Sequence, residues 1–217
     1  MNIIKASAKI MNLSTREEGI ELLRRIEYAA RVSHASESAQ TADSWERFIK
    51  AVVIGHGDWS VVEHASVSVD FTVDRGITHE LVRHRLFSYT QASTRFINHV
   101  KNPAAFVEPE FKTAEARMDW FTAVEEAEHR YHCLIKNGES PQIARSVLPN
   151  SLASRIIMTG NLRSFRHLFL MRSTKETHPA MKDVIIPLLE EFQAKIPLLY
   201  NDIEPNQRQV DNLRKAR

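Results

Sequence analysis

The chain has 217 residues, of which 43% are hydrophobic and 26% are charged, a composition typical of globular proteins and unlike that of disordered ones. Its 29 basic and 27 acidic residues leave a formal net charge of +2, which is too small to predict nucleic-acid binding. We expect a single domain over residues 1–217 with a hydrophobic core of its own.

Two further absences narrow the class of protein. The first residues lack the long apolar core of a signal peptide, and no stretch approaches the ~20 apolar residues of a membrane span. Cys133 is the one cysteine, so a disulfide within the chain is excluded. We therefore expect a cytoplasmic protein that does not bind a membrane.

In the first third of the chain the pattern predicts two helices and one strand. Residues 15–31 have the apolar stripe of a helix, with Ser14 and Glu17 as a capping box. A second helix is predicted from about residue 43 to residue 55. The clearest strand is 66–73, because Val and Phe alternate there with polar residues.

Helices dominate the rest of the chain. Gly76 is predicted to end the strand, and a short helix with Ile77 and Leu81 follows. Further helices are predicted at 111–136, closed by Asn137-Gly138, at 141–149, at 161–172 and at 179–199, where Pro187 and Pro197 are expected kinks or breaks. A second strand is predicted at 151–158. Many helices around one small, mainly antiparallel sheet indicate an α+β fold.

The run RHRLFSYTQASTRF, residues 83–96, concentrates arginines beside hydroxyl groups. Each guanidinium offers a planar fork of donors, which suits a phosphorylated or carboxylated ligand. Cations on both sides of His84 should disfavour its protonated form, leaving a neutral hydrogen-bonding group. The alternative is a solvated basic surface.

Two other passages carry comparable groups. Upstream lie AARVS (29–33) and GHGDWSVVEHAS (55–66), and downstream lie Arg145, Asn161, Arg163 and Arg172. The six glycines form neither a GxGxxG nor a P-loop pattern, so a nucleotide would have to be held by side-chain cations. The alternative is that Arg163 and Arg166 face solvent and Arg172 only complements the dipole at a helix end.

Together these passages, spread over residues 29–172, resemble those of the flavin-dependent thymidylate synthases, which methylate dUMP without a catalytic cysteine. The resemblance implies that family's α/β fold and a homotetramer with shared active sites. It also implies FAD, NADPH and methylenetetrahydrofolate as cofactors, dUMP as the small-molecule substrate, and no nucleic-acid partner.

The resemblance also implies roles for individual residues. Those that would hold FAD are His64, Ser66, Arg83, His84, Arg85, Gln91, Asn161, Arg163 and His167. Those that would hold dUMP are Glu80, Arg83, Gln91, Ser93, Arg95, Arg145 and Arg172. Arg172 would be catalytic, stabilising a uracil ring ionised at N3.

The chain departs from the family pattern at several positions. Gln91 and Ala92 stand where an acidic residue is usual, Phe96 replaces a tyrosine, and His167 replaces an asparagine. These departures leave open a related methylase or hydroxymethylase acting on UMP or dUMP, and also the one-carbon donor, the reductant and the oligomeric state. A non-catalytic nucleotide- or nucleic-acid-binding module is the third alternative, and the near-neutral charge counts against it.

Metal chemistry and thiol chemistry are not expected. His79 and His84 are five residues apart, whereas a zinc-binding HExxH helix needs a spacing of four. Cys133 has no activating partners in sequence beyond His129 and His132, so we interpret it as a packed thiol.

Overall fold

The alternating segment predicted as a strand is β3 (Ser66–Asp74), in which Val67, Val69, Phe71 and Val73 are fully buried. It belongs to a small, mainly antiparallel sheet with the strand order β2 (Ser7–Ile10), β3, β6 (Ala153–Asn161), β4 (Ser88–Gln91). The predicted second strand is thus confirmed as β6, displaced by a few residues. The α+β class is confirmed as well.

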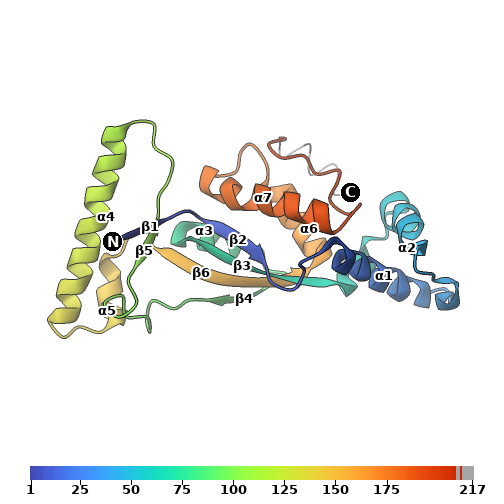
Figure 1. Ribbon diagram of the computed structural model, residues 1–217, viewed down its shortest axis with the longest axis horizontal. Coiled ribbons are helices and arrows are strands. Elements are labelled where there is room, and N and C mark those ends of the chain that lie inside the picture. The colour runs from blue at the N-terminus through green and yellow to red at the C-terminus, as the bar shows by residue number, and fades with distance from the viewer. Residues whose placement is uncertain (209–210, 212–217) are drawn as a thin grey trace. The chain divides into compact units, whose positions relative to one another are not determined.

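The computed structural model describes residues 1–208 and residue 211 (Figure 1). These residues form two compact units. The first unit contains residues 1–7, 71–83 and 89–157. The second contains residues 8–70, 84–88 and the described residues from 158 onward. None of the described helices is both long and apolar enough to cross a membrane.

The first unit contains the helices α3 (Arg75–Leu81), α4 (Ala114–Lys136) and α5 (Pro141–Ala144). A short parallel pair, β1 (Asn2–Ile4) with β5 (Ala105–Val107), was not predicted. A hydrophobic core cluster of the first unit contains Ala104, Phe106, Val124 and Leu152. The predicted long helix is α4, yellow-green in Figure 1, and its end is confirmed at Asn137-Gly138, where Gly138 adopts a φ of 92°.

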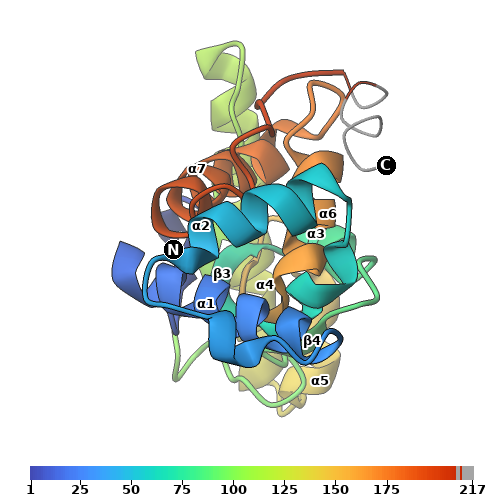
Figure 2. The ribbon, with the colours of Figure 1, turned by 90° about the vertical axis from the view of Figure 1, so that its right-hand side faces the viewer.

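The second unit contains α1 (Arg16–Val32), α2 (Ser44–Phe48), α6 (Leu162–Arg172) and α7 (Pro179–Lys195). The helix predicted to end near residue 55 continues beyond α2 as a π-helix, Ile49–Gly55. α7 packs against α1 and α6 (Figure 2), and Pro187 lies inside it. The core of the second unit contains an aromatic cluster, whose contacting ring centroids lie 4.9–6.2 Å apart. Its members are Phe165, Phe169, Phe192 and Tyr200.

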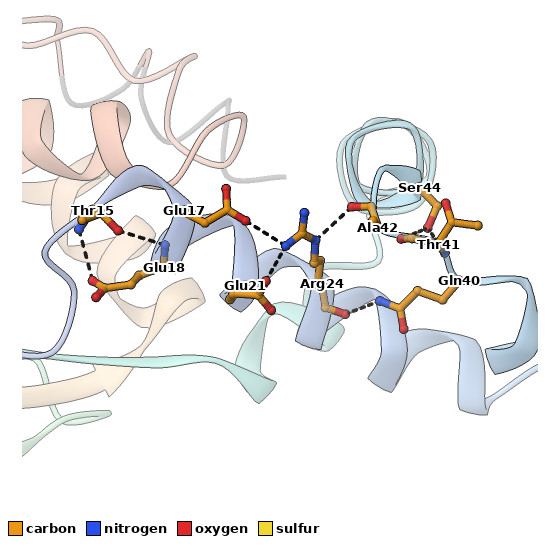
Figure 3. Close-up of polar contacts among 9 residues, drawn as sticks. All are labelled: Thr15, Glu17, Glu18, Glu21, Arg24, Gln40, Thr41, Ala42 and Ser44. Atoms are coloured by element: carbon orange, nitrogen blue, oxygen red, sulfur yellow. Dashed lines mark hydrogen bonds and ion pairs between the residues drawn. The ribbon is translucent and has the colours of Figure 1, made fainter.

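The capping box of α1 is one residue later than predicted. The hydroxyl of Thr15 accepts a hydrogen bond from the Glu18 amide, and the Glu18 carboxylate accepts one from the Thr15 amide (Figure 3). Ser14 and Glu17 therefore do not form the box. Glu17 instead binds Arg24, whose Nε donates to the carbonyl of Ala42 and so joins α1 to the segment before α2.

The start and end of α3 fix the position of the arginine-rich run. Asp74 is the N-cap, its side chain accepting a hydrogen bond from the Ile77 amide at 2.9 Å, so β3 ends at a cap and Gly76 lies inside the helix. The prediction that Gly76 ends the strand was wrong. The helix ends at Leu81, so the run Arg83–Arg85 follows it as irregular backbone.

Candidate active site

The two units divide the predicted site residues between them. The second unit contains His64, Ser66, His84, Arg85, Asn161, Arg163, His167 and Arg172. The first contains Glu80, Arg83, Gln91, Ser93, Arg95 and Arg145. Apart from Arg172, every predicted residue of the second unit was expected to hold the flavin. The first unit contains all the other residues expected to hold the nucleotide, of which Arg83 and Gln91 were expected to hold the flavin as well.

His84 and Arg172 form the most distinctive contact in the second unit. Nε of Arg172, in the last turn of α6, donates a hydrogen bond of 3.0 Å to Nε2 of His84. A guanidinium always carries its proton, so Nε2 must be the acceptor and the imidazole proton resides on Nδ1. The ring of His167, also on α6, lies 6.3 Å from that of His84, edge to face.

The surroundings keep His84 neutral. Burial, then the positive charge of Arg172, then His167 lower the pKa of His84 from 6.5 to about 4. The neutral imidazole expected from the sequence is thus supported, but the cause is different. Burial and a cation 88 residues away dominate, whereas from the sequence the two flanking arginines were the expected cause.

The beginning of α6 holds two further predicted residues. Oδ1 of Asn161 accepts a hydrogen bond from the Ser164 amide at 2.8 Å, so Asn161 is the N-cap of the helix. Arg163, the second residue of α6, forms an ion pair of 2.6 Å with Glu63, and about half of each side chain is exposed. Glu63 belongs to the 3-10 segment Trp59–His64, which places His64 just beyond that pair in the chain.

In the first unit, two contacts join the segment around Ser93 to the region of α5. Arg145 Nη1 donates to the hydroxyl of Thr94 at 3.0 Å, and Arg95 Nε donates to Gln142 Oε1 at the same distance. The guanidinium of Arg145 therefore contacts the residue after Ser93, whereas that of Arg95, two residues after Ser93, contacts α5. Arg95 is exposed and Arg145 is partly buried.

Gln91, the last residue of β4, is fixed differently. Its side-chain nitrogen donates to Thr78 and to Ser154, both at 3.0 Å. Thr78 belongs to α3, in the turn before Glu80, and Ser154 belongs to β6. Glu80 is partly buried, and Arg83 is exposed just after the helix. Sequence spacing carries no signal for the partners Thr78, Thr94 and Gln142, because each pairing depends on tertiary contact.

Arg166 is buried, which the sequence did not predict. The sequence left open that it faces solvent, but it is only 6% exposed and forms a two-pronged ion pair of 2.6–2.7 Å with Asp202. Its guanidinium also stacks over Trp59, 4.4 Å from the ring centroid. These three residues line a hollow of about 620 Å³ in the second unit, together with Lys50 and His56.

Cys133 has a histidine neighbour on its own helix, α4. In the described part of the chain, no three His, Cys, Asp or Glu residues are grouped so as to hold a metal ion. Sγ of Cys133 lies 3.5 Å from Nε2 of His129, one turn earlier on α4. This contact lies in the first unit, on a helix that carries none of the predicted site residues.

Comparisons with known proteins agree with one another. Residues 20–198 match the family model described as thymidylate synthase complementing protein, Thy1. A flavin-dependent thymidylate synthase of Mycobacteroides abscessus is 33% identical over 199 residues, covering 82% of this chain and 78% of that protein. The enzyme of the same name from Mycobacterium tuberculosis is 32% identical, with the same coverage.

A crystal structure of a UMP/dUMP methylase from Streptomyces cacaoi, bound with 5-Br dUMP, has a similar fold. Its TM-score is 0.75 at 22% sequence identity, covering 91% of this chain and 94% of that one. The family model and the curated relatives together show that this chain belongs to the thymidylate synthase complementing protein family, which contains the flavin-dependent thymidylate synthases.

Proposed function

We propose that this enzyme methylates dUMP to dTMP, with FAD as its cofactor, methylenetetrahydrofolate as the one-carbon donor and NADPH as the reductant. Family membership supports the reaction class. The observation that best supports the proposed chemistry is the hydrogen bond from Nε of Arg172 to the neutral imidazole of His84.

The first unit offers a site for the nucleotide phosphate. Arg95 belongs to the segment that carries Ser93, and Arg145 contacts Thr94 in the same segment, so two cations and a hydroxyl are available within one short region. Guanidiniums suit phosphate because they donate two parallel hydrogen bonds to it. We assign phosphate binding to these three residues.

The second unit has donors that fit the diphosphate and the ring of FAD. Arg85 and Arg163 are exposed cations, and His64 is an exposed imidazole. The flavin would lie against these residues, with Ser66, Asn161 and His167 supplying further polar contacts. When bound, reduced FAD supplies the hydride that completes the methyl group.

Activation of the uracil ring would be electrostatic. The C5 carbon of uracil is a weak nucleophile, and Cys133, the one thiol of the chain, lies beside His129 on α4. A cation at the edge of the ring stabilises the N3-ionised form and the enolate-like charge that develops as C5 attacks. We assign this role to Arg172, whose charge is permanent and whose orientation is restrained by His84.

A second candidate is a methylase that also accepts UMP. Gln91 stands where the family usually has an acidic residue, and the protein of similar fold from Streptomyces cacaoi is a UMP/dUMP methylase. The two candidate functions are distinguished by incubating the purified enzyme with dUMP or with UMP and measuring the product masses by mass spectrometry. A mass gain of one methyl group on dUMP alone supports the first proposal.

An absorption spectrum of the purified protein is the simplest test of the flavin. Bands of oxidised flavin in the visible region would support the proposal. A colourless protein that takes up no FAD, and that binds DNA or RNA in a salt-sensitive manner, would favour a non-catalytic binding module instead.

Arg172→Ala should abolish methyl transfer while FAD stays bound, and Arg172→Lys should recover part of the rate because it restores the charge without the planar fork. Turnover retained in Arg172→Ala would remove Arg172 from the mechanism.

We further propose that the chain is one folding domain, acts as a cytoplasmic homotetramer and shares active sites between subunits. Sedimentation analysis of the purified protein tests the assembly.

A further inference from the structure

The guanidinium of Arg166, on α6, is held from three sides within the second unit. Its Nη1 donates to the carbonyl of Leu199 at 2.8 Å. Its two terminal nitrogens donate to the two carboxylate oxygens of Asp202 at 2.6–2.7 Å, and its face lies 4.4 Å from the centroid of the Trp59 ring. Two parallel hydrogen bonds restrain the plane of a guanidinium. Asp202 therefore orients the surface against which Trp59 stacks.

The segment that carries Asp202 is itself well connected. Nε2 of Gln193 donates to the carbonyl of Tyr200 at 3.0 Å, and the hydroxyl of Tyr200 donates to the carbonyl of Leu162, at the start of α6, at 2.9 Å. Leu198 has a φ of 77°, in the left-handed region, which persists at a residue with a β carbon only where the surroundings determine the backbone. The carboxylate of Asp202 is thus presented to Arg166 from a restrained backbone.

On the other side of Arg166, Trp59 begins the 3-10 segment Trp59–His64, which runs along α6 in the opposite direction. Three contacts join the segment and the residue after it to the helix. In chain order they are Trp59 with Arg166, Glu63 with Arg163, and the carbonyl of Ala65 with the amide of Leu162, at 2.9 Å. His64 lies between the last two contacts, so its position along α6 depends on how this segment is aligned.

The alignment brings together three residues expected to hold the flavin. Arg163 and His167 are four residues apart on α6, so they lie on the same face of the helix, and both are exposed. His64, from the 3-10 segment, is exposed as well. A shift of the segment along α6 would move His64 relative to the other two.

The three contacts differ in how well they can maintain the alignment. The pair of Glu63 and Arg163 is half exposed, and ion pairs of that kind contribute little to stability. The contact at Ala65 is a single backbone hydrogen bond. Arg166 is only 6% exposed, so its attraction to the Trp59 ring is the least screened by water. The stack at Trp59 is therefore the contact best able to fix the segment.

We propose that Trp59 and Asp202 are positioning residues of the flavin site. Asp202 orients the guanidinium of Arg166, the guanidinium holds Trp59, and the stack aligns the segment Trp59–His64 with α6 so that His64 meets the same flavin as Arg163. This inference rests on the proposed function. Neither positioning residue touches the flavin, so both act on its affinity and leave the chemistry of the uracil ring unchanged.

The first test is a fluorescence titration of the full-length protein, freed of flavin, with FAD. Asp202→Asn removes the charge and one acceptor, and Trp59→Leu removes the ring, so each should weaken FAD binding about tenfold, as expected for loss of a desolvated cation–π contact. Trp59→Phe keeps an aromatic face and should recover most of the affinity. Binding of dUMP, whose phosphate we assign to Arg95 and Arg145, should not change.

Steady-state kinetics separates positioning from a loss of folded protein. With FAD varied, the apparent KM for FAD of Asp202→Asn should rise about tenfold, following its affinity, while kcat at saturating FAD stays near that of the wild type. A variant that only loses folded protein would lower kcat and keep that KM. The side chain of Asp202 is 47% exposed, so Asp202→Asn should stay folded, which circular dichroism checks.

Arg24→Met is the matched control. It removes another guanidinium of the second unit, one that binds Glu17 and the carbonyl of Ala42 (Figure 3), and it should change neither FAD affinity nor kcat.

The outcomes distinguish this inference from the proposed function. If the wild type binds FAD and both Asp202→Asn and Trp59→Leu bind it equally tightly, the positioning role is refuted and the proposed function stands. The same conclusion follows if these variants lower kcat without raising the KM for FAD, or if Arg24→Met weakens FAD binding as much as they do. If the wild type takes up no FAD, the proposed function fails, and this inference fails with it.

Discussion

His84 provides a quantitative test of the pair with Arg172. The unfolded imidazole takes up its proton near pH 6.5, whereas in the folded protein burial and Arg172 lower the pKa to about 4. Between these values the unfolded state binds more protons, so the free energy of unfolding should fall as the pH falls from 6.5 to 4. Below pH 4 the ring is protonated in both states, and this contribution stops changing.

The size of the effect follows from the same two values. At ~1.4 kcal/mol per pKa unit, the full difference amounts to about 3 kcal/mol, of which about 2 kcal/mol has been lost at pH 5. Because the ring is partly exposed, solvent screening reduces this, and we expect about 1 kcal/mol at pH 5.

The perturbation is His84→Gln, since the glutamine oxygen can still accept the hydrogen bond from Arg172 but does not titrate. Urea denaturation of the wild type and the variant at pH 7 and pH 5 should show about 1 kcal/mol more acid destabilisation in the wild type. Nitrogen-15 spectra of the histidine rings should show the His84 proton on Nδ1. Equal acid sensitivity in both proteins, or a His84 titration near pH 6.5, would refute the reasoning.

Three further substitutions have definite expected outcomes. Gly19→Ala should lower stability by about 2 kcal/mol or more, because its Cβ would lie 1.8 Å from the backbone carbonyl oxygen of Lys195, and Tm in a thermal melt should fall by about 4–8 °C. Asn161→Ala should cost about 1 kcal/mol through loss of the α6 cap, while Asn161→Asp keeps the cap and should be near neutral, as chemical denaturation would show. Cys133→Ser should retain methyl transfer in a product assay, and an inactive but folded variant would contradict electrostatic activation.

The sequence predicted the elements whose hydrophobic period is unambiguous. β3 alternates over nine residues, so its buried face was evident, and the helices α4, α6 and α7 were located within a few residues of their observed ends. The short strands β1, β2, β4 and β5 were missed, because three or four residues are too few to establish a period. The capping box of α1 was misplaced by one residue, since Ser14 with Glu17 and Thr15 with Glu18 offer the same pattern.

The site residues show a similar division. Arginines, histidines and hydroxyl groups were identified from their types and spacing, because those are properties of the sequence itself. Their hydrogen-bonding partners were not identified, because the partners lie far away in the sequence. The pairs are Arg172 with His84, Arg166 with Asp202 and Gln91 with Thr78, separated by 88, 36 and 13 residues.

What the sequence alone determined is which chemical groups the protein has available, many guanidiniums and a single thiol, and hence the kind of ligand it suits. The tertiary structure decided their states: His84 is neutral, Arg166 is buried and paired, and the side chain of Gln91 is bound by two buried hydroxyl groups. The physical reason is that protonation and hydrogen-bond direction depend on burial and on which donors and acceptors meet, and folding alone brings those groups together.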